Sequence, residues 1–193
     1  MASNLGLAGD IFALYEKNMT HPAIQPRAGK AAFRIGLLCL PDSNLMGLAA
    51  ALDPFRAANR QAGKPLYEWQ FLSPEGGKVE LTTGLGFDSA ALPFQVSFDL
   101  MIVVAGLRLE SHSTPALRAW LRQLRSRDIA FCGVEGGAWV LARAGLLHNR
   151  RATTHWEDLE AFAQAFDEVE VVPDRFVIDG PAMTTGGAAP CLD

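Results

Sequence analysis

The most informative stretch for chemistry is a short apolar run that breaks at an acidic residue flanked by glycines. Residues 129–134 are apolar enough for a buried parallel strand, and Glu135 follows, just before Gly136 and Gly137. Apolar residues then recur at helical spacing until Gly145, which can end a helix. This order predicts an elbow that holds Glu135 beside the free N–H groups of a helix start. A carboxylate there can act as a base, a counter-charge or a hydrogen-bond acceptor, but it is a poor nucleophile.

Further polar or glycine-rich turns follow other predicted strands. Asn44 comes after the first strand, Gly106 and Leu107 follow a second, and His155 and Trp156 lie after the elbow helix. Ligands of parallel α/β sheets bind at the carboxyl ends of the strands, so we expect these residues to converge on one edge with Glu135. Simpler interpretations stay open. Helix N–H groups alone can stabilise Glu135, His155 can pair with it to hold the turn, and Asn44 can serve only as a helix cap.

Strands and helices alternate along the whole chain. Strands are predicted at 33–40, 67–72, 100–105 and 129–134, with a small hairpin over 79–88 and short C-terminal strands at 169–172, 175–178 and 182–184. Helices are predicted from Leu45 to Arg56 with a kink at Pro54, from Pro115 with Thr114 as cap, over 138–144 and over 156–166. This order predicts an α/β sandwich with a largely parallel central sheet and a mixed edge formed by the last strands.

Composition limits the class of protein. A chain of 193 residues with 49% hydrophobic and 20% charged content is typical of one globular domain. A net charge of −4 disfavours nucleic-acid binding by this domain, and no apolar segment approaches the roughly 18 residues of a membrane span. Three cysteines without a CxxC pair indicate neither a disulfide framework nor a metal site. We therefore expect a reducing cytoplasm, no membrane and no cofactor, with residues 1–30 as an N-terminal arm.

Several segments, taken in order, carry a family resemblance over about residues 33–193. They are Leu52-Asp-Pro-Phe-Arg-Ala-Ala-Asn-Arg60, Gly133-Val-Glu-Gly-Gly-Ala-Trp-Val-Leu-Ala-Arg-Ala-Gly-Leu-Leu147, Arg151-Ala-Thr-Thr-His-Trp156 and Thr184-Thr-Gly-Gly187. The chain resembles the amino-terminal sensor domain of AraC-type transcriptional regulators, which has a class I glutamine amidotransferase-like, PfpI-type fold. The resemblance implies a flavodoxin-like three-layer sandwich over 31–193. It also implies a homodimer that binds DNA only through a C-terminal helix-turn-helix domain absent from these residues.

The resemblance also sets expectations for the site. In catalytic relatives the elbow residue is cysteine, a histidine follows about 20 positions later, and an acid near the position of Gly47 supports the cysteine. Here the elbow carries Glu135, His155 has the expected spacing, and Cys132 lies on the strand before the turn. The backbone N–H groups of Gly106 and Leu107 match a loop that binds an oxyanion in those relatives. In this chain they are expected to hold a ligand carboxylate.

Loss of the nucleophile with retention of the surrounding residues favours a binding domain over a catalyst. The acidic-elbow branch of these regulators includes sensors of arginine, carnitine and glycine betaine, so the resemblance implies a cationic or zwitterionic effector. The predicted ligand-binding residues are Glu135, His155, Trp156, Gly106, Leu107, Gly136 and Asn44. The alternative is a PfpI-type hydrolase or hydratase in which Glu135 and His155 act as acid and base on a small molecule. A purely structural oligomerisation module is a third interpretation.

Overall fold

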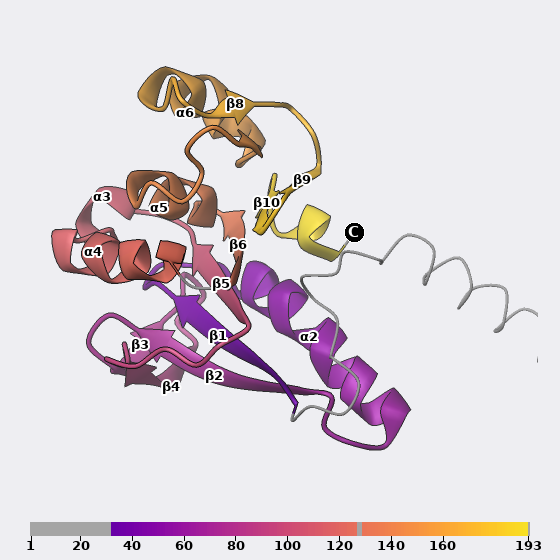
Figure 1. Cartoon of the computed structure of the whole chain (residues 1–193). Coiled ribbons are helices and arrows are strands. Elements are labelled where there is room, and N and C mark those ends of the chain that lie inside the picture. The colour runs from indigo at the N-terminus through magenta and orange to yellow at the C-terminus, as the bar shows by residue number, and fades with distance from the viewer. Residues whose placement is uncertain (1–31, 127–128, 193) are drawn as a thin grey trace, which may run out of the picture.

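Two neighbouring parallel strands, β1 and β5, form the centre of the fold. The computed structural model describes residues 32–126 and 129–192, so the predicted arm at 1–30 lies outside the described residues (Figure 1). Five parallel strands make the middle of the sheet: β2 (Tyr67–Ser73), β1 (Phe33–Cys39), β5 (Leu100–Ala105), β6 (Ala130–Glu135) and β10 (Ala182–Thr185). The apolar runs in β1 and β5 suit strands that are covered on both faces.

Antiparallel strands close both edges of this sheet. β4 (Gly86–Ala91) pairs parallel with β2, β3 (Gly77–Glu80) pairs antiparallel with β4, and β9 (Phe176–Asp179) pairs antiparallel with β10. The eight-stranded order is β3-β4-β2-β1-β5-β6-β10-β9, which confirms the largely parallel sheet.

The strand predicted at 169–172 does not join the C-terminal edge of this sheet. β8 (Glu170–Val171) pairs instead with β7 (Arg151–Ala152) in a separate two-stranded sheet. The Glu170 N–H donates to the Arg150 carbonyl, and the Val172 N–H donates to the Ala152 carbonyl. These bonds occupy the backbone of the segment, so the mixed edge is made by β9 and β10 alone.

Helices cover both faces and make three layers. α2 (Leu45–Ala62) lies on one side of the sheet (Figure 1). The other side carries α3 (Leu109–His112), α4 (Pro115–Gln123), α5 (Gly137–Arg143) and α6 (Leu159–Ala165). Three short 3-10 turns complete the described elements: η2 (Leu124–Ser126), η3 (Trp156–Asp158) and η4 (Ala189–Leu192). The predicted α/β sandwich is confirmed.

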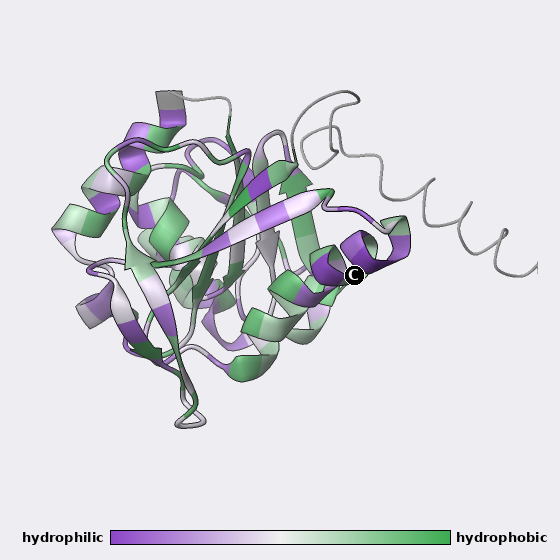
Figure 2. Ribbon diagram, turned by 90° about the horizontal axis from the view of Figure 1, so that it is seen from below, coloured by the Kyte–Doolittle hydropathy of each residue, from purple (hydrophilic) through white to green (hydrophobic). Residues whose placement is uncertain are grey.

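The period of two along β5 divides the core between the layers. Leu100, Ile102 and Val104 pack on the α2 side, whereas Met101 and Val103 pack on the side of α4 and α5. All of these residues are buried. Figure 2 shows the resulting concentration of hydrophobic colouring on the central strands. Burial on both faces explains why this segment reads as a continuous apolar run rather than an alternating one.

Two helix starts follow the predicted capping chemistry. The Asn44 side chain accepts a hydrogen bond from the Gly47 N–H at 2.5 Å, and α2 then continues through Pro54. Thr114 accepts from the Leu117 N–H at 3.2 Å, with Pro115 in the first turn of α4. Each cap satisfies one of the N–H groups that the first turn of a helix leaves without a partner.

Candidate ligand-binding site at the elbow

The turn between β6 and α5 is tight because glycines let the backbone segments approach closely. A methyl group on Gly137 would overlap the Val103 carbonyl oxygen, and one on Gly133 would lie 2.7 Å from the Ala138 nitrogen. Glu135 itself has a φ of 54°, in the left-handed region that side chains other than glycine rarely adopt. The predicted elbow is therefore present. Such strain is commonly found at functional sites.

The Glu135 carboxylate is held by one amide from the start of α2. Asn44 Nδ2 lies 2.5 Å from both carboxylate oxygens of Glu135, while its Oδ1 accepts from the Gly47 N–H. The two contacts fix the orientation of the amide, since only its nitrogen can donate to a carboxylate. Glu135 is 8% exposed, and its carboxylate contacts a polar group. Asn44 is therefore both a helix cap and a partner of the elbow acid.

The catalytic set of the relatives is not assembled around this turn. Gly47 stands where the supporting acid was expected, and an added methyl group there would already lie 3.0 Å from Asn44 Oδ1. Cys132 packs against the core on the α2 side, and burial raises the pKa of its thiol far above the ordinary value. A thiol held in its neutral form is a poor nucleophile. The acid thus stands at the elbow and the amide on the helix.

His155 and Trp156 lie together after β7. Their ring centroids are 5.7 Å apart, and His155 Nδ1 lies 3.6 Å from a Glu157 carboxylate oxygen. Among contacts of the described residues, no hydrogen bond or ion pair joins His155 to Glu135. The helix predicted over 156–166 begins only at Leu159, and Trp156 lies 68% exposed in η3.

Buried threonines position the loop that carries His155. The Thr153 N–H donates to Thr184 Oγ1 at 2.9 Å, and Thr153 Oγ1 donates to the Asp174 carbonyl at 2.9 Å. Thr154 Oγ1 donates to the Glu135 carbonyl at 3.3 Å. The loop is therefore tied to both β10 and the elbow.

Of the two N–H groups predicted to hold a ligand carboxylate, that of Leu107 already has a backbone partner, as does the N–H of Gly136, another predicted ligand-binding residue. The Leu107 N–H donates to the Asp42 carbonyl at 3.2 Å, and the Gly136 N–H donates to the Ala105 carbonyl at 3.0 Å. A methyl group on Gly106 would lie 2.5 Å from the same Asp42 oxygen, so the loops after β1 and β5 are in close contact. A ligand carboxylate at Leu107 or Gly136 would first have to break a backbone hydrogen bond.

A charged cluster that the sequence reasoning missed joins those same loops. Arg108 Nε and His112 Nε2 each lie 2.7 Å from Asp42 Oδ2. The hydrogen bond from Arg108, and then that from His112, hold the pKa of Asp42 below its ordinary value. Asp42 and Arg108 both have positive φ, as Glu135 does, so β1, β5 and β6 all lead into left-handed turns at one edge. The sequence offered one signal, an acidic residue directly after a strand.

Trp139 belongs to an aromatic cluster rather than to the elbow. Its ring lies 5.1 Å from Phe162 and 5.6 Å from Phe166, both edge-on, and the Arg143 guanidinium lies 5.4 Å from its centroid. Its Nε1 is buried without a hydrogen-bond partner. Trp139 therefore packs α5 against α6, as expected for a large aromatic residue within a helix.

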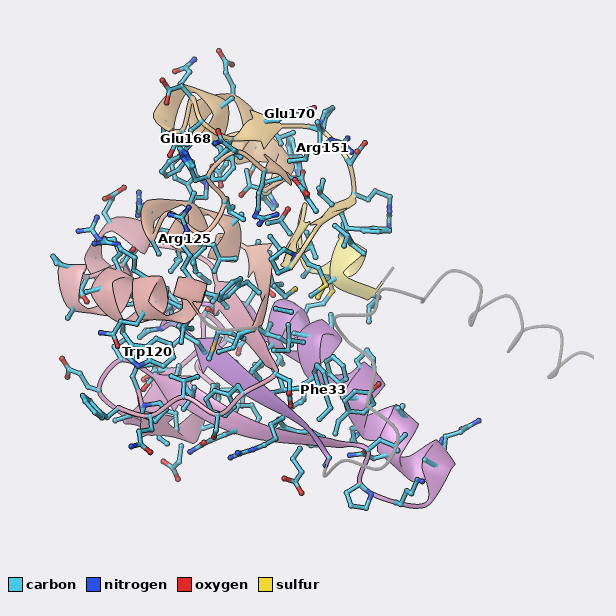
Figure 3. The ribbon with its side chains drawn as sticks, in the orientation of Figure 1. Phe33, Trp120, Arg125, Arg151, Glu168 and Glu170 are labelled. Atoms are coloured by element: carbon cyan, nitrogen blue, oxygen red, sulfur yellow. The ribbon has the colours of Figure 1, made fainter. Side chains whose placement is uncertain are left out.

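A cavity of about 350 Å³ lies away from the elbow, beside β7 and β8. Figure 3 labels Arg151, Glu168 and Glu170 in its wall. Its charges largely pair with one another: Arg151 lies 3.5 Å from Glu170, and Arg150 lies 3.7 Å from Asp179. We favour the elbow as the candidate site because, among the described residues, the Glu135 carboxylate is held by a neutral amide rather than by a basic side chain.

Fold and elbow together define a doubly wound α/β domain built on the amidotransferase-like plan. Residues 67–190 match the DJ-1/PfpI family, and the chain belongs to that family. The domain is homologous to the amino-terminal regions of AraC-type regulators with helix-turn-helix domains.

Two curated relatives illustrate this homology. The HTH-type transcriptional regulator CdhR of Pseudomonas aeruginosa is 41% identical over 157 residues, which cover 81% of this chain and 46% of CdhR. The HTH-type transcriptional regulator GlxA of Rhizobium meliloti is 39% identical over 162 residues, which cover 83% of this chain and 50% of GlxA. The chain thus spans about half the length of these relatives.

Solved structures share the fold. An AraC family transcriptional regulator from Pseudomonas putida superposes with a TM-score of 0.74 at 23% identity, covering 83% of this chain and 86% of that one. Drosophila melanogaster DJ-1beta gives a TM-score of 0.71 at 18% identity, covering 84% and 86%. Within the residues that the structure describes, we find no helix long and apolar enough to cross a membrane.

Proposed function

We propose that this chain is the non-catalytic effector-sensing and dimerisation domain of an AraC-type transcriptional regulator, and that it binds a small cationic or zwitterionic metabolite at Glu135. The observation that carries the proposal is the elbow carboxylate, presented by a strained turn and held by the Asn44 amide. An amide orients a carboxylate without neutralising it, so the negative charge stays available to a ligand cation. The homology to HTH-type regulators supports the regulatory role.

Two features support the proposed class of ligand: the negative charge of Glu135 and the exposed ring of Trp156. A charge-assisted contact to Glu135 is worth about 1.5–3 kcal/mol in a partly dehydrated site. The exposed ring of Trp156 offers a face for an ammonium or quaternary ammonium group. A basic amino acid, carnitine or a betaine-like molecule, the class that the family resemblance implies, has the required charge. DNA would be bound by a helix-turn-helix domain outside these residues, in a cytoplasmic homodimer.

The geometry supports this reading over the hydrolase or hydratase alternative. Acid–base catalysis by Glu135 and His155 needs both groups within reach of one substrate. The described contact of the His155 ring nitrogen is with Glu157, and Glu135 is held by Asn44 instead. The positions of the catalytic thiol and its supporting acid are occupied by Glu135 and Gly47.

Thermal-shift and calorimetric titrations with L-arginine, L-carnitine and glycine betaine test the proposal. A ligand at 100 times its Kd stabilises the folded state by about 2.7 kcal/mol, so at least one of these probes should raise the melting temperature. The effect should vanish in Glu135→Gln and persist in Glu157→Gln, whose carboxylate is exposed. L-Citrulline, whose side chain is uncharged, is the matched control for the guanidinium group of arginine. Turnover of amide, nitrile or isonitrile substrates that disappears in Glu135→Gln would instead establish the catalytic alternative.

A further inference from the structure

The C-terminal end of the described chain packs against residues on both sides of the elbow. Ala188, just before η4, is buried, and a methyl group on Gly47 would lie 3.8 Å from its Cβ. A methyl group on Gly187 would lie 3.8 Å from His155 Cδ2. The segment therefore passes between the first turn of α2 and the His155 loop, which flank the elbow.

η4 also carries a thiol that packs on the α2 side of the sheet. Cys191 packs against the core cluster on the α2 side, where Cys132 packs as well. Burial, and then the negative charge of Glu135, raise the pKa of the Cys191 thiol to about 11. Val134, the residue before Glu135, belongs to the same core cluster. Cys191 and the strand end that leads into the elbow therefore pack in one layer.

Hydrogen bonds make this segment a defined structure. Thr185 Oγ1 donates to the Gly187 carbonyl at 3.0 Å, and the Cys191 N–H donates to the Ala188 carbonyl at 3.2 Å. The turn packs on α2, whose first turn is capped by the same Asn44 that holds Glu135. The elbow acid, the start of α2 and η4 are thereby in one continuous set of contacts.

We propose that η4 reports whether the Glu135 site is occupied: a cation that pairs with Glu135 alters the packing of Ala188 and Cys191 against α2. The ligand acts in two ways, since it neutralises the charge of Glu135 and adds volume near Ala188. A ligand can shift the packing of η4 only if it interacts differently with the two packing states, and both the charge and the added volume provide such a difference. The signal passes to the polypeptide that continues beyond η4 in a full-length regulator. This inference rests on the proposed function for its ligand.

The first experiment needs no ligand. Cys191 modification by a disulfide reagent is followed at pH 8 by mass spectrometry of its peptide, and Cys191→Ser identifies the signal. Because the thiolate is the reactive species, Glu135→Gln should accelerate modification of Cys191 by about threefold or more. Glu157→Gln removes an exposed charge elsewhere, so it should stay near the wild-type rate. Equal rates in wild type and Glu135→Gln, with circular dichroism showing both folded, would overturn the proposal.

The second experiment adds L-arginine, L-carnitine or glycine betaine at concentrations that saturate binding by calorimetry. A bound probe should change the Cys191 modification rate by about threefold or more in the wild type and leave Glu135→Gln unchanged. A probe that binds while the Cys191 rate stays the same removes the role of η4 but preserves the proposed function. Absence of binding by all three probes refutes the cationic-effector function, and the ligand-free comparison then still decides whether Glu135 and η4 are coupled.

Discussion

Asn44 joins the start of α2 to the elbow by using both ends of its amide. Its Oδ1 accepts from the Gly47 N–H, and its Nδ2 lies 2.5 Å from each carboxylate oxygen of Glu135. The family resemblance implies an acid on the helix and a thiol at the elbow in catalytic relatives. In this chain the acid stands at the elbow and the helix supplies a neutral donor, an arrangement suited to holding a charge in place.

Substitutions of Asn44 should separate its two contacts. Asn44→Ala removes the cap and the amide donor, so we expect the free energy of unfolding to fall by about 1–3 kcal/mol. Asn44→Asp keeps the cap but places a second carboxylate against Glu135, which should raise the pKa of the pair. Its stability deficit should therefore be present at pH 7 and shrink as the pH falls. Urea denaturation at pH 7 and pH 5 measures both effects, and an Asn44→Asp variant as stable as wild type at pH 7 would contradict the assigned contact.

Gly137 is required by packing, independent of any ligand. A Cβ at this position overlaps the Val103 carbonyl oxygen, so Gly137→Ala must push α5 away from β5. We expect a loss of at least about 3 kcal/mol in denaturant unfolding. Gly63→Ala is the matched control, because Gly63 has a φ of 62° but no atom within 4 Å of the added methyl. Its cost should be only about 1–2 kcal/mol, from the left-handed backbone.

The Asp42 cluster should make stability depend on acid pH. The folded-state pKa of Asp42 is lowered from 3.8, first by the hydrogen bond from Arg108 and then by that from His112. A group with a depressed folded pKa contributes stability above its unfolded pKa and loses it as pH falls through the folded value. Asp42→Asn should therefore be less stable than wild type from pH 7 to pH 5, with the difference narrowing below about pH 4. The pKa of Asp53 is also lowered, by its hydrogen bond with Arg56, but this pair is exposed and screened by solvent, so Asp53→Asn should show a smaller difference.

Substitution of Trp156 should affect ligand binding, whereas substitution of Trp139 should affect only stability. Trp139→Phe removes a buried N–H without a partner and retains an aromatic ring, so stability should change by no more than about 2 kcal/mol and probe binding should not change. Trp156→Ala should leave stability within about 0.5 kcal/mol, because the side chain is exposed. It should weaken a quaternary ammonium probe by about 2- to 30-fold through loss of the cation–π contact. If Trp139→Phe weakened probe binding and Trp156→Ala did not, the ligand would bind at the aromatic cluster and the assigned role of Trp156 would be wrong.

Much of the architecture was predictable because it rests on local patterns. The apolar runs that became β1, β5 and β6 marked strands covered on both faces, and Thr114-Pro115 marked a helix start. The glycines around Glu135 predicted a tight strand-to-helix turn, and the structure has one. In each case the physical cause acts within a few residues of the signal, through solvent exclusion, capping or backbone freedom.

The site depended on contacts between residues distant in the sequence. Nothing local predicts that Asn44 meets Glu135 or that Arg108 and His112 meet Asp42, because the sheet order brings those strand ends together. The same packing engages the Leu107 and Gly136 N–H groups and pairs β8 with β7. It also lays η4 beside the elbow. The sequence by itself determined which side chains could carry charge at the strand ends. Only the tertiary structure decided which of those groups contact one another, because those contacts depend on the order of the strands in the sheet.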